Sequence, residues 1–381
     1  MLRDYVQCIK FGSNGEMVRG LRLLGGLLYS RFKYDMGPLH YSLFRFADTS
    51  WSEWGSYIRN QQFSTYVVKN RVPDELHDLV KDKVRFYQHC IARDIPTPPI
   101  ICIFGRYPRA SPDCPLICVP DVDSLENALA NAPAEIFAKP IDGAHGTGTF
   151  LIRQKSHQLV FGQPEKSGSV SDLYTYAQEQ AKRGGSVLLL QPRIQPHSDL
   201  SNISSANALP TAQIVTAMAD GAPQILYSCV RLPVGNSITD NFSKSMSGNL
   251  IAAVDKDTGV LSDAWGSAQA EWPVIRATSI HPDTGRKIRG AVFPCWSKVR
   301  DLALKAHSSL PKLQTVGWDI AVTEDEVLLV EANDDYCIEM IQVAYQRGLG
   351  NHLMSALHIS GKWSPGNRNI TLPALIGSGT P

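Results

Sequence analysis

The 381-residue chain is expected to form an α+β fold. Residues 75–93 place apolar side chains at helical spacing, whereas residues 186–191 and 317–322 are short apolar runs typical of buried strands. The helical and strand-like segments do not alternate strictly along the chain, which favours α+β over a doubly wound parallel sheet. An acidic turn at residues 323–326 separates two strand-like runs and predicts a hairpin.

Four regions are expected along the chain. They are an aromatic-rich helical region over residues 1–74, two α+β lobes over 75–190 and 191–360, and an extended tail over 361–381. The aromatic side chains of the first region are interpreted as a layer packed on the main body, because aromatic stripes at helical spacing are usually core. An aromatic surface that binds the acceptor substrate is the alternative.

The charge balance argues against a polyanionic main partner. The chain carries 37 basic and 36 acidic residues, which gives a net charge of +1. A protein that binds nucleic acid or an anionic membrane chiefly through its overall charge needs an excess of basic residues. Any anion site must therefore be local, built from a few lysines, arginines and backbone amides.

The cysteines and the N-terminus favour a cytoplasmic protein. The eight cysteines are scattered through a long chain, and the only close pair, Cys114 and Cys118, has no second pair to complete a zinc site. Residues 1–10 have no apolar core of the kind a signal peptide needs. The apolar run at residues 21–28 is too short to span a bilayer, although the protein could still work beside a membrane.

The strand-like runs around the acidic turn carry three oxygen-bearing side chains. Glu331 and Asn333 are two residues apart, so on a strand their side chains leave from the same face. A hairpin brings Asp319 from the neighbouring strand towards them. Two carboxylates and an amide oxygen form a hard, all-oxygen ligand set, which suits Mg²⁺ that also holds phosphates. We therefore expect Asp319, Glu331 and Asn333 to bind metal.

A lysine and a glycine-rich loop form the second candidate motif. Lys139 ends a strand-like run and precedes a loop over residues 142–148. The loop contains Gly143, Gly146 and Gly148. Glycines let backbone amides approach a polyphosphate closely, and the lysine adds positive charge. The loop is neither a Walker loop nor a dinucleotide fingerprint, because residues 149–153 read as strand. An ordinary hairpin turn is the alternative.

The order of these segments resembles the ATP-grasp superfamily. More specifically, residues 78–345 look similar to the sugar-transfer-associated ATP-grasp family. The segments that carry the resemblance are Asp82-Lys83, Ile95–Pro98, Ala138–Pro140, Leu190–Ile194, Arg231–Gly235, Asp240–Phe242 and Gly317–Asn333. The resemblance implies an ATP-grasp fold, in which two α+β sub-lobes clamp ATP, preceded here by an N-terminal helical region.

The resemblance also implies roles for residues around the nucleotide. Lys83 and Lys139 would contact the phosphates of ATP. The loop that folds over these phosphates would include Gly143, His145, Gly146 and Gly148. The hinge beside the adenine would include Gln191, Arg193 and Ile194.

The implied reaction is an ATP-dependent ligation. ATP would phosphorylate a small carboxylate, and an amine or hydroxyl acceptor would attack the acylphosphate, releasing ADP and phosphate. Arg231, Asn241 and Lys139 would act on the γ-phosphate or the acylphosphate, beside one or two Mg²⁺ held by Asp319, Glu331 and Asn333. A phosphotransferase and an inactive nucleotide-binding partner protein are the alternatives. Lys83 as a solvated helix residue and Arg231 as a structural ion-pair partner also stay open.

The chain departs from the family pattern at three places. Gln213 stands where an arginine is usual, residues 243–248 contain less glycine than is common, and His145 interrupts the phosphate loop. The change at Gln213 removes one cation and bears on the acceptor or the γ-phosphate more than on ATP binding. The identity of the carboxylate and of the acceptor does not follow from the sequence.

Overall fold

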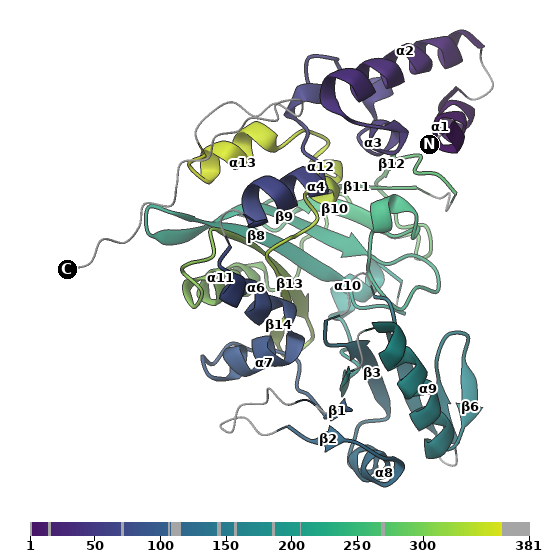
Figure 1. Ribbon diagram of the computed structural model, residues 1–381, viewed down its shortest axis with the longest axis vertical. Helices are drawn as coiled ribbons and strands as arrows, with labels where there is room; N and C mark the ends of the chain where they lie inside the picture. The colour runs from purple at the N-terminus through teal and green to yellow at the C-terminus, as the bar shows by residue number, and fades with distance from the viewer. Residues whose placement is uncertain are drawn as a thin grey trace.

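The computed structural model describes residues 2–13, 17–69, 72–105, 107, 116–142, 146–155, 158–184, 187–205, 207–267 and 271–359. An N-terminal helical region lies at one end of the molecule, a sheet formed by β8–β14 occupies the middle, and a sheet formed by β1–β7 lies at the other end (Figure 1). Mixed helices and two sheets confirm the predicted α+β class. The expected tail over residues 361–381 lies outside the described residues.

The first sheet is seven-stranded, with the order β2-β1-β7-β3-β4-β5-β6. Its strands are β1 (Cys102–Phe104), β2 (Cys118–Val119), β3 (Glu135–Pro140), β4 (Phe150–Lys155), β5 (Gln158–Phe161), β6 (Lys166–Gly168) and β7 (Leu188–Pro192). Strands β1 and β2 pair in parallel, and the other neighbours in this sheet are antiparallel. Helices α8 (Val122–Ala130) and α9 (Val170–Gly184) share one apolar core with the strands, so they cover one face of this sheet.

The second sheet is also seven-stranded, with the order β12-β11-β10-β9-β8-β13-β14, and every neighbouring pair is antiparallel. Its strands are β8 (Thr211–Ala219), β9 (Ala222–Leu232), β10 (Leu250–Val254), β11 (Leu261–Gly266), β12 (Arg276–Thr278), β13 (Thr315–Val322) and β14 (Val327–Asn333). The sequence predicts residues 255–290 to be irregular, which is wrong for β11 and β12. Leu261 and Ala264 of β11 are buried against the sheet core, and this packing holds the strand in place.

The two faces of the second sheet are covered by different helices. One face packs against α11 (Trp296–Ser308), α6 (Asp74–Lys81) and α7 (Lys83–Ile91). The other face packs against α12 (Ile338–Tyr345), α13 (Gly350–Ala356) and the N-terminal region. Although α6 and α7 precede the first sheet in the chain, their apolar side chains therefore belong to the core of the second.

The helix expected over residues 75–93 is interrupted at Asp82. This residue has φ −85° and ψ 103°, and its side chain accepts hydrogen bonds from the backbone N–H of Val84 and Arg85. Aspartate is favoured at the start of a helix because its carboxylate satisfies N–H groups that have no partner within the helix. Asp82 therefore ends α6 and begins α7, which places Lys83 at the first position of α7.

The N-terminal region is built around buried aromatic side chains. It contains α1 (Leu2–Ser13), α2 (Met17–Tyr34), α3 (Pro38–Leu43) and α4 (Asn60–Phe63), with short turns η1 (Phe46–Asp48), η2 (Trp54–Ser56) and η3 (Ser64–Val68). Phe46 and Trp54 stack with ring centroids 4.6 Å apart, and both are buried in one core with α12 and α13. Burial supports the packed-layer interpretation and leaves these rings unable to form an acceptor surface.

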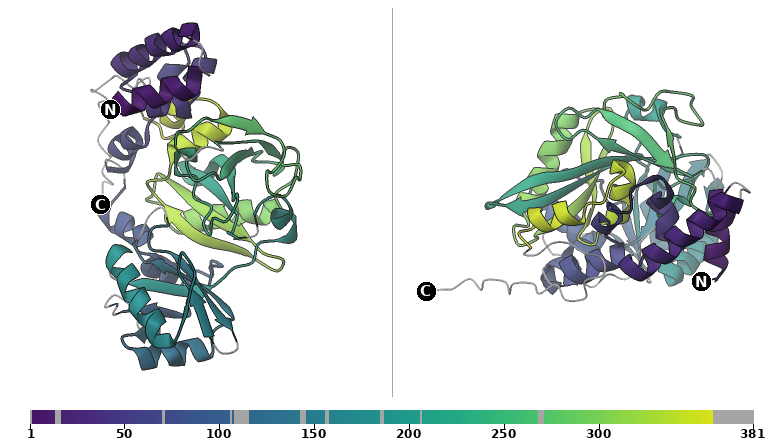
Figure 2. Two further views of the ribbon diagram at one scale, coloured as in Figure 1. Left: turned by 90° about the vertical axis from the view of Figure 1, so that its right-hand side faces the viewer. Right: turned by 90° about the horizontal axis from the view of Figure 1, so that it is seen from above.

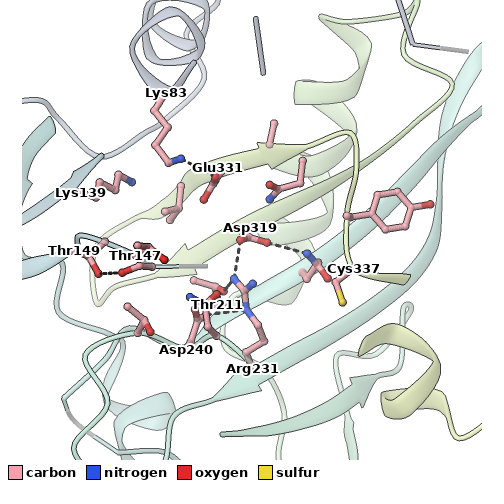
Figure 3. Close-up of a pocket in the computed structure, with 18 of the residues that line it drawn as sticks. Lys83, Lys139, Thr147, Thr149, Thr211, Arg231, Asp240, Asp319, Glu331 and Cys337 are labelled. Atoms are coloured by element: carbon pink, nitrogen blue, oxygen red, sulfur yellow. Dashed lines mark hydrogen bonds and ion pairs between the residues drawn. The ribbon is translucent and has the colours of Figure 1, made fainter. Parts of the chain in front are cut away.

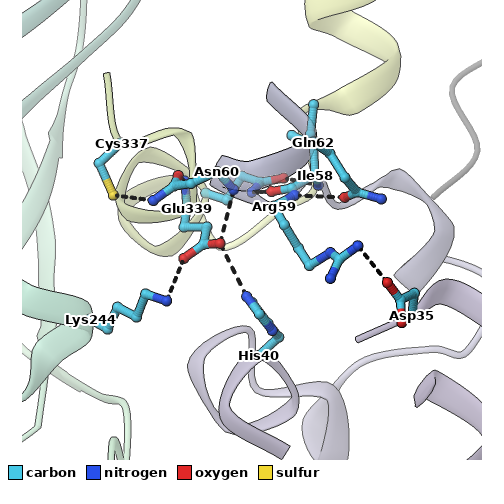
Figure 4. A network of polar contacts seen from close by, with 10 residues as sticks. Asp35, His40, Ile58, Arg59, Asn60, Gln62, Lys244, Cys337 and Glu339 are labelled. Atoms are coloured by element: carbon cyan, nitrogen blue, oxygen red, sulfur yellow. Dashed lines mark hydrogen bonds and ion pairs between the residues drawn. The ribbon is translucent and has the colours of Figure 1, made fainter. Parts of the chain in front are cut away.

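Polar contacts also hold the N-terminal region to α12. Gln342 accepts from the backbone N–H of Ile58 at 2.9 Å and donates to the carbonyl of the same residue at 2.7 Å. The buried Glu339 carboxylate lies 3.1 Å from His40 Nε2 and accepts from the backbone N–H of Asn60 at 2.9 Å (Figure 4). Its other oxygen lies 3.7 Å from Lys244 Nζ. Burial works to raise the pKa of Glu339, but His40 and Lys244 outweigh it and lower the pKa overall.

A substitution at Gly348, between α12 and α13, tests how closely these helices pack against the N-terminal region. A Cβ atom at this position would overlap Ser56 and would lie 2.6 Å from the backbone nitrogen of Tyr57. We expect Gly348→Ala to lower the free energy of unfolding by about 1–3 kcal/mol in chemical denaturation, because the overlap involves backbone that must shift. The matched control is Gly25→Ala in α2, where a Cβ meets nothing within 4 Å. Alanine there should stabilise by up to about 1 kcal/mol, and equal effects at both positions would contradict the close fit.

Candidate active site

A cavity of about 1160 Å³ lies where the two sheets and the N-terminal region meet. Most of the site residues expected from the sequence line it: Lys83, Lys139, Gly146, Gln191, Arg193, Ile194, Arg231, Asn241, Asp319, Glu331 and Asn333. Gly148 is not among the lining residues, and Gly143 and His145 lie outside the described residues. A single small ligand occupies a pocket of roughly 300–1,000 Å³, so this cavity has room for more than one.

The predicted hairpin is confirmed, and it forms one wall of the cavity (Figure 3). The turn between β13 and β14 is closed by a hydrogen bond of 2.9 Å from the backbone N–H of Thr323 to the carbonyl of Glu326. Asp319 is directly opposite Glu331 in the ladder, and Asn333 lies two residues further along β14. Opposed residues on antiparallel strands project from the same face, so all three side chains leave the sheet towards the cavity.

Arg231 joins the buried carboxylate of Asp319 and the half-buried carboxylate of Asp240 at the floor of the cavity. Its Nη2 atom lies 2.7 Å from Asp319 Oδ2, and its Nε atom lies 3.0 Å from Asp240 Oδ2. Thr211 completes the cluster, because its hydroxyl accepts from Arg231 and donates to Asp240, each at 2.5 Å. The arginine thus has an ion-pair role within the fold as well as a place in the cavity wall.

Burial shifts the ionisation of this cluster. Loss of solvent raises the pKa of Asp319 to about 6; Arg231 opposes this rise and the nearby Glu331 adds to it. Burial also works to lower the pKa of Arg231, but Asp240 and Asp319 outweigh it and raise the pKa further. Arg231 is therefore a permanent cation, while Asp319 ionises at a higher pH than an ordinary aspartate does.

Gln213 lies beside this cluster on β8. Its amide nitrogen donates to Asp319 Oδ1 at 3.2 Å, and its side chain is only 3% exposed. Within the described part of the chain, its carbonyl oxygen has no hydrogen-bond partner. A buried acceptor without a partner is costly, which favours a donor or a cation supplied from the cavity. Arg231 already gives Asp319 a cation, so the arginine missing at position 213 does not leave this carboxylate uncompensated.

Two lysines face the carboxylates of the hairpin. Lys83 Nζ lies 3.2 Å from Glu331 Oε1, and the backbone N–H of Lys83 donates to the carbonyl of Ile141 at 3.1 Å, which ties α7 to the end of β3. Lys139 projects from β3 and is buried; burial lowers its pKa to about 8, against the attraction of Glu331. For Glu331, burial favours a higher pKa, but the two lysines reverse this and lower it.

The described end of the glycine loop is held close to the Asn241 segment. Gly146 has φ +72°, and a Cβ atom there would lie 2.9 Å from Asn241 Nδ2. Its left-handed backbone and this close approach both require glycine. Gly148 has φ +76° and packs against Pro140, so it shapes the turn between β3 and β4 without reaching the cavity. The loop therefore brings backbone amides to the same region as Asn241.

The expected adenine hinge follows β7. Gln191 donates to the carbonyl of Pro98 at 2.9 Å, which ties β7 to the segment before β1. Arg193 Nη1 lies 3.0 Å from Glu135 Oε1, so the guanidinium forms an ion pair with a residue of the first sheet. Apolar side chains surround this end of the cavity, including Phe137, Leu151, Ile194 and Leu209. Such a lining suits a flat aromatic ring.

Several lining residues are not among the site residues expected from the sequence. Asp240 directly precedes Asn241 in a segment that carries the family resemblance, so the sequence offered a signal that Asp240 lies near the site. His77 of α6 was not identifiable, yet its Nδ1 lies 2.6 Å from the buried Asp334 Oδ2. Lys244 lies within three successive left-handed residues, Ser243, Lys244 and Ser245, with φ of 46°, 53° and 68°. Backbone of this kind is uncommon outside glycine and concentrates at functional sites.

The donor set fits a magnesium–phosphate site. Asp319, Glu331 and Asn333 offer oxygen atoms from one face, and the carbonyl of Gln213 adds a further oxygen nearby. The cations of Lys83 and Arg231 occupy the neighbourhood of the two carboxylates in this structure. A divalent cation bound to these oxygen atoms would take over part of the charge neutralisation that the two cations now provide.

Removing the buried cation should be far more costly than removing an exposed one. We expect Arg231→Met to lower the free energy of unfolding by about 3–5 kcal/mol, because Asp319 and Asp240 would lose their shared partner. Arg289→Met is the control: Arg289 pairs with Asp263 but is 67% exposed, and its loss should cost about 1 kcal/mol or less. Urea unfolding measures both, and similar losses would contradict the buried cluster.

The sequence of this chain matches the model of a known protein family. The profile of the sugar-transfer associated ATP-grasp family matches residues 61–357. A comparison with curated protein sequences finds no match. D-alanyl-alanine synthetase A from Vibrio cholerae O1 biovar eltor str. N16961 is 11% identical, with 74% of this chain and 65% of that chain covered and a TM-score of 0.41.

Two further solved structures are similar at the same level. D-alanine-D-alanine ligase from Helicobacter pylori is 13% identical, with 80% of this chain and 66% of that chain covered and a TM-score of 0.41. N5-carboxyaminoimidazole ribonucleotide synthetase from Thermus thermophilus is 13% identical, with 77% of this chain and 57% of that chain covered and a TM-score of 0.40. The chain spans less than two thirds of the length of each of the three. The family match covers most of the described chain and both sheets, and the protein therefore belongs to the sugar-transfer associated ATP-grasp family.

Proposed function

We propose that the protein is an ATP-dependent ligase that activates a small carboxylate as an acylphosphate and joins it to an amine or hydroxyl acceptor. The observation that carries this proposal is the arrangement across the cavity. Two lysines face the carboxylates of the β13–β14 hairpin, and Arg231 remains charged beside them. Phosphoryl transfer needs positioning and charge neutralisation more than covalent chemistry from the protein, and this arrangement offers both.

In the first step, a carboxylate oxygen of the substrate attacks the γ-phosphorus of ATP. The bond from this phosphorus to the β–γ bridging oxygen breaks, and ADP leaves with the electron pair. Lys139 and Lys83 would neutralise phosphate oxygens. To do so, Lys83 would break its ion pair with Glu331 and contact the nucleotide. Asp319, Glu331 and Asn333 would hold Mg²⁺, which, when bound, supplies further positive charge to the phosphates.

In the second step, the acceptor attacks the carbonyl carbon of the acylphosphate. The carbon–oxygen bond to the phosphoryl group breaks, phosphate leaves, and the acceptor loses one proton. Arg231 and Asn241 line the cavity within reach of this region, and their donors would stabilise the charge that develops on oxygen. Arg231 suits this role because its two carboxylate partners, Asp240 and Asp319, outweigh the effect of burial and keep it positively charged.

We call the end of the cavity that is lined by the N-terminal region its outer end, and this end would supply space for the acceptor. Asn60 and Ser64 of the N-terminal region line it, together with His77, Asp335 and Lys244. Hydroxyl, amide and charged groups of both signs suit a polar acceptor that carries an amine. An amino acid or an amino sugar satisfies this description, and the name of the family agrees with a sugar-related acceptor.

ADP release against a panel of amino acids and amino sugars tests the proposal. With Mg²⁺, ATP and a matching pair of substrates, we expect ADP and phosphate in equal amounts and a product with a new amide or ester bond. Asp319→Asn should lower kcat by about a hundredfold or more, because the substitution removes a charged oxygen from the phosphate site. Asp263→Asn, at a half-buried carboxylate that does not line the cavity, is the control and should leave the rate unchanged.

Other results would support the alternatives. A stable phosphorylated product without release of phosphate would establish a phosphotransferase. Tight ATP binding by calorimetry without turnover on any pair, and without phosphate exchange, would favour an inactive nucleotide-binding partner protein. Failure to bind ATP with Mg²⁺ would falsify the proposal as a whole.

The low pKa of Lys139 makes ATP binding depend on pH. In the unliganded protein Lys139 loses its charge as the pH rises through about 8, against 10.5 for an ordinary lysine. A phosphate contact favours the charged form, so ATP affinity should fall above that pH by up to about tenfold per pH unit. Calorimetry in buffers of different ionisation enthalpy should show proton uptake on binding. Lys139→Arg keeps its charge and should abolish the dependence; an unchanged dependence would contradict the assignment.

A further inference from the structure

Helix α2 exposes a continuous row of large apolar side chains on the outside of the molecule. Leu21, Leu24, Leu28 and Phe32 follow one another at spacings of three, four and four residues, which places them on one helical face. All four are exposed, with Leu21 at 65% and Phe32 at 85%. We call this row the apolar stripe. The opposite side of α2, with Leu23 and Leu27, is buried against the rest of the N-terminal region.

The stripe belongs to a wider concentration of exposed apolar groups. Among the side chains that the structure describes in the first 51 residues, seven large apolar ones are exposed: Leu2, Val6, Leu21, Leu24, Leu28, Phe32 and Trp51. The remaining six are scattered over the rest of the described chain: Ile91, Ile117, Met246, Val260, Ile280 and Val292. Scattered apolar side chains are normal on a protein surface, whereas a contiguous group marks an interaction site.

Basic side chains lie on both sides of the stripe. With 100° between successive residues, Arg31 lies next to the stripe on one side, whereas Arg22 and Lys33 lie more than about 100° around the helix from the centre of the stripe on the other side. Residues 1–35 contain six basic and three acidic residues in a chain whose basic and acidic residues otherwise nearly balance. One of the three acids, Asp35, is neutralised by ion pairs with Arg31 and Arg59.

An aromatic cluster completes the border. Trp51 is half exposed and packs on Tyr29 of α2, with ring centroids 4.6 Å apart. Lys33 donates to the hydroxyl of the same tyrosine at 2.7 Å. Tryptophan and tyrosine with basic neighbours at the edge of an apolar face are the composition that favours the boundary between lipid headgroups and acyl chains.

We propose that the outer face of α2 binds the surface of an anionic lipid membrane, with the apolar stripe entering the headgroup boundary and Arg22, Arg31 and Lys33 contacting lipid phosphates. The basic residues beside the stripe favour an anionic membrane over a second copy of the chain. If two copies met through α2, their basic residues would repel each other. No described helix is both long and apolar enough to cross a bilayer, so the contact lies along the surface.

The proposed contact leaves the cavity accessible. No described residue of α1 or α2 lines the cavity, and α2 lies at the end of the molecule remote from the first sheet (Figures 1 and 2). The inference therefore does not depend on the proposed ligase activity. It agrees with the expectation that any anion site is local, because residues 1–35 are basic within a chain of nearly balanced total charge.

Sedimentation of the full chain with lipid vesicles tests the proposal. We expect binding to phosphatidylcholine vesicles that contain phosphatidylserine, and binding weakened by about tenfold or more when the serine lipid is omitted or salt is raised. The double variant Leu28→Ser/Phe32→Ser should lose about tenfold or more in affinity, because both side chains would lose their place in the boundary. Both are exposed, so circular dichroism should show an unchanged fold.

A matched variant distinguishes vesicle binding by the apolar stripe from non-specific hydrophobic binding. Ile280→Ser/Val292→Ser removes two other exposed apolar side chains that lie far from α2 in the chain, and binding should not change. Equal loss in both double variants would overturn the proposal, as would no binding to serine-containing vesicles. Light scattering that shows a dimer dissolved by Leu28→Ser/Phe32→Ser, without vesicle binding, would instead assign the stripe to a second copy of the chain.

Discussion

The candidate site depends on one buried cation shared between carboxylates. Arg231 contacts Asp319 on β13 and Asp240 in the loop after β9, and Thr211 of β8 bridges two of them. Removing any one of these charges from water is costly unless the others are present. The same ion pairs that join strands of the second sheet therefore fix the carboxylates that face the cavity, so the stability of the sheet and the geometry of the site are not separable.

Lys83 connects the two sheets at the cavity through a backbone hydrogen bond and an ion pair. Lys83 begins α7, whose apolar side packs on the second sheet, but its backbone N–H is bonded to Ile141 at the end of β3 in the first sheet. Its ammonium group reaches Glu331 across the cavity. A ligand carrying negative charge competes with Glu331 for this lysine and for Lys139. Binding of a polyphosphate would thus take both lysines from Glu331, whose carboxylate would then need another cation, such as a Mg²⁺ ion bound together with the phosphates.

The sequence contained the local parts of this site but few of its long-range contacts. The hairpin could be predicted because alternation and a turn are encoded within 17 consecutive residues, 317–333. The break at Asp82 was missed because apolar periodicity continues through it, while capping depends on the side chain of one residue. The His77–Asp334 pair joins residues 257 positions apart, and no local pattern connects them. Aromatic burial at Phe46 and Trp54 likewise depends on α12 and α13.

The N-terminal region shows the same contrast between local sequence patterns and long-range contacts. Its helices were foreseeable from apolar spacing, whereas its orientation is set by contacts with α12, which lies about three hundred residues later in the chain. Glu339 makes this orientation relevant to the cavity, because one carboxylate contacts both the N-terminal region and Lys244 on the cavity wall. A buried carboxylate tolerates the loss of its partners poorly. Displacing the N-terminal helices would therefore free a charge next to the outer end of the cavity, so the position of these helices and the electrostatics of that end are coupled.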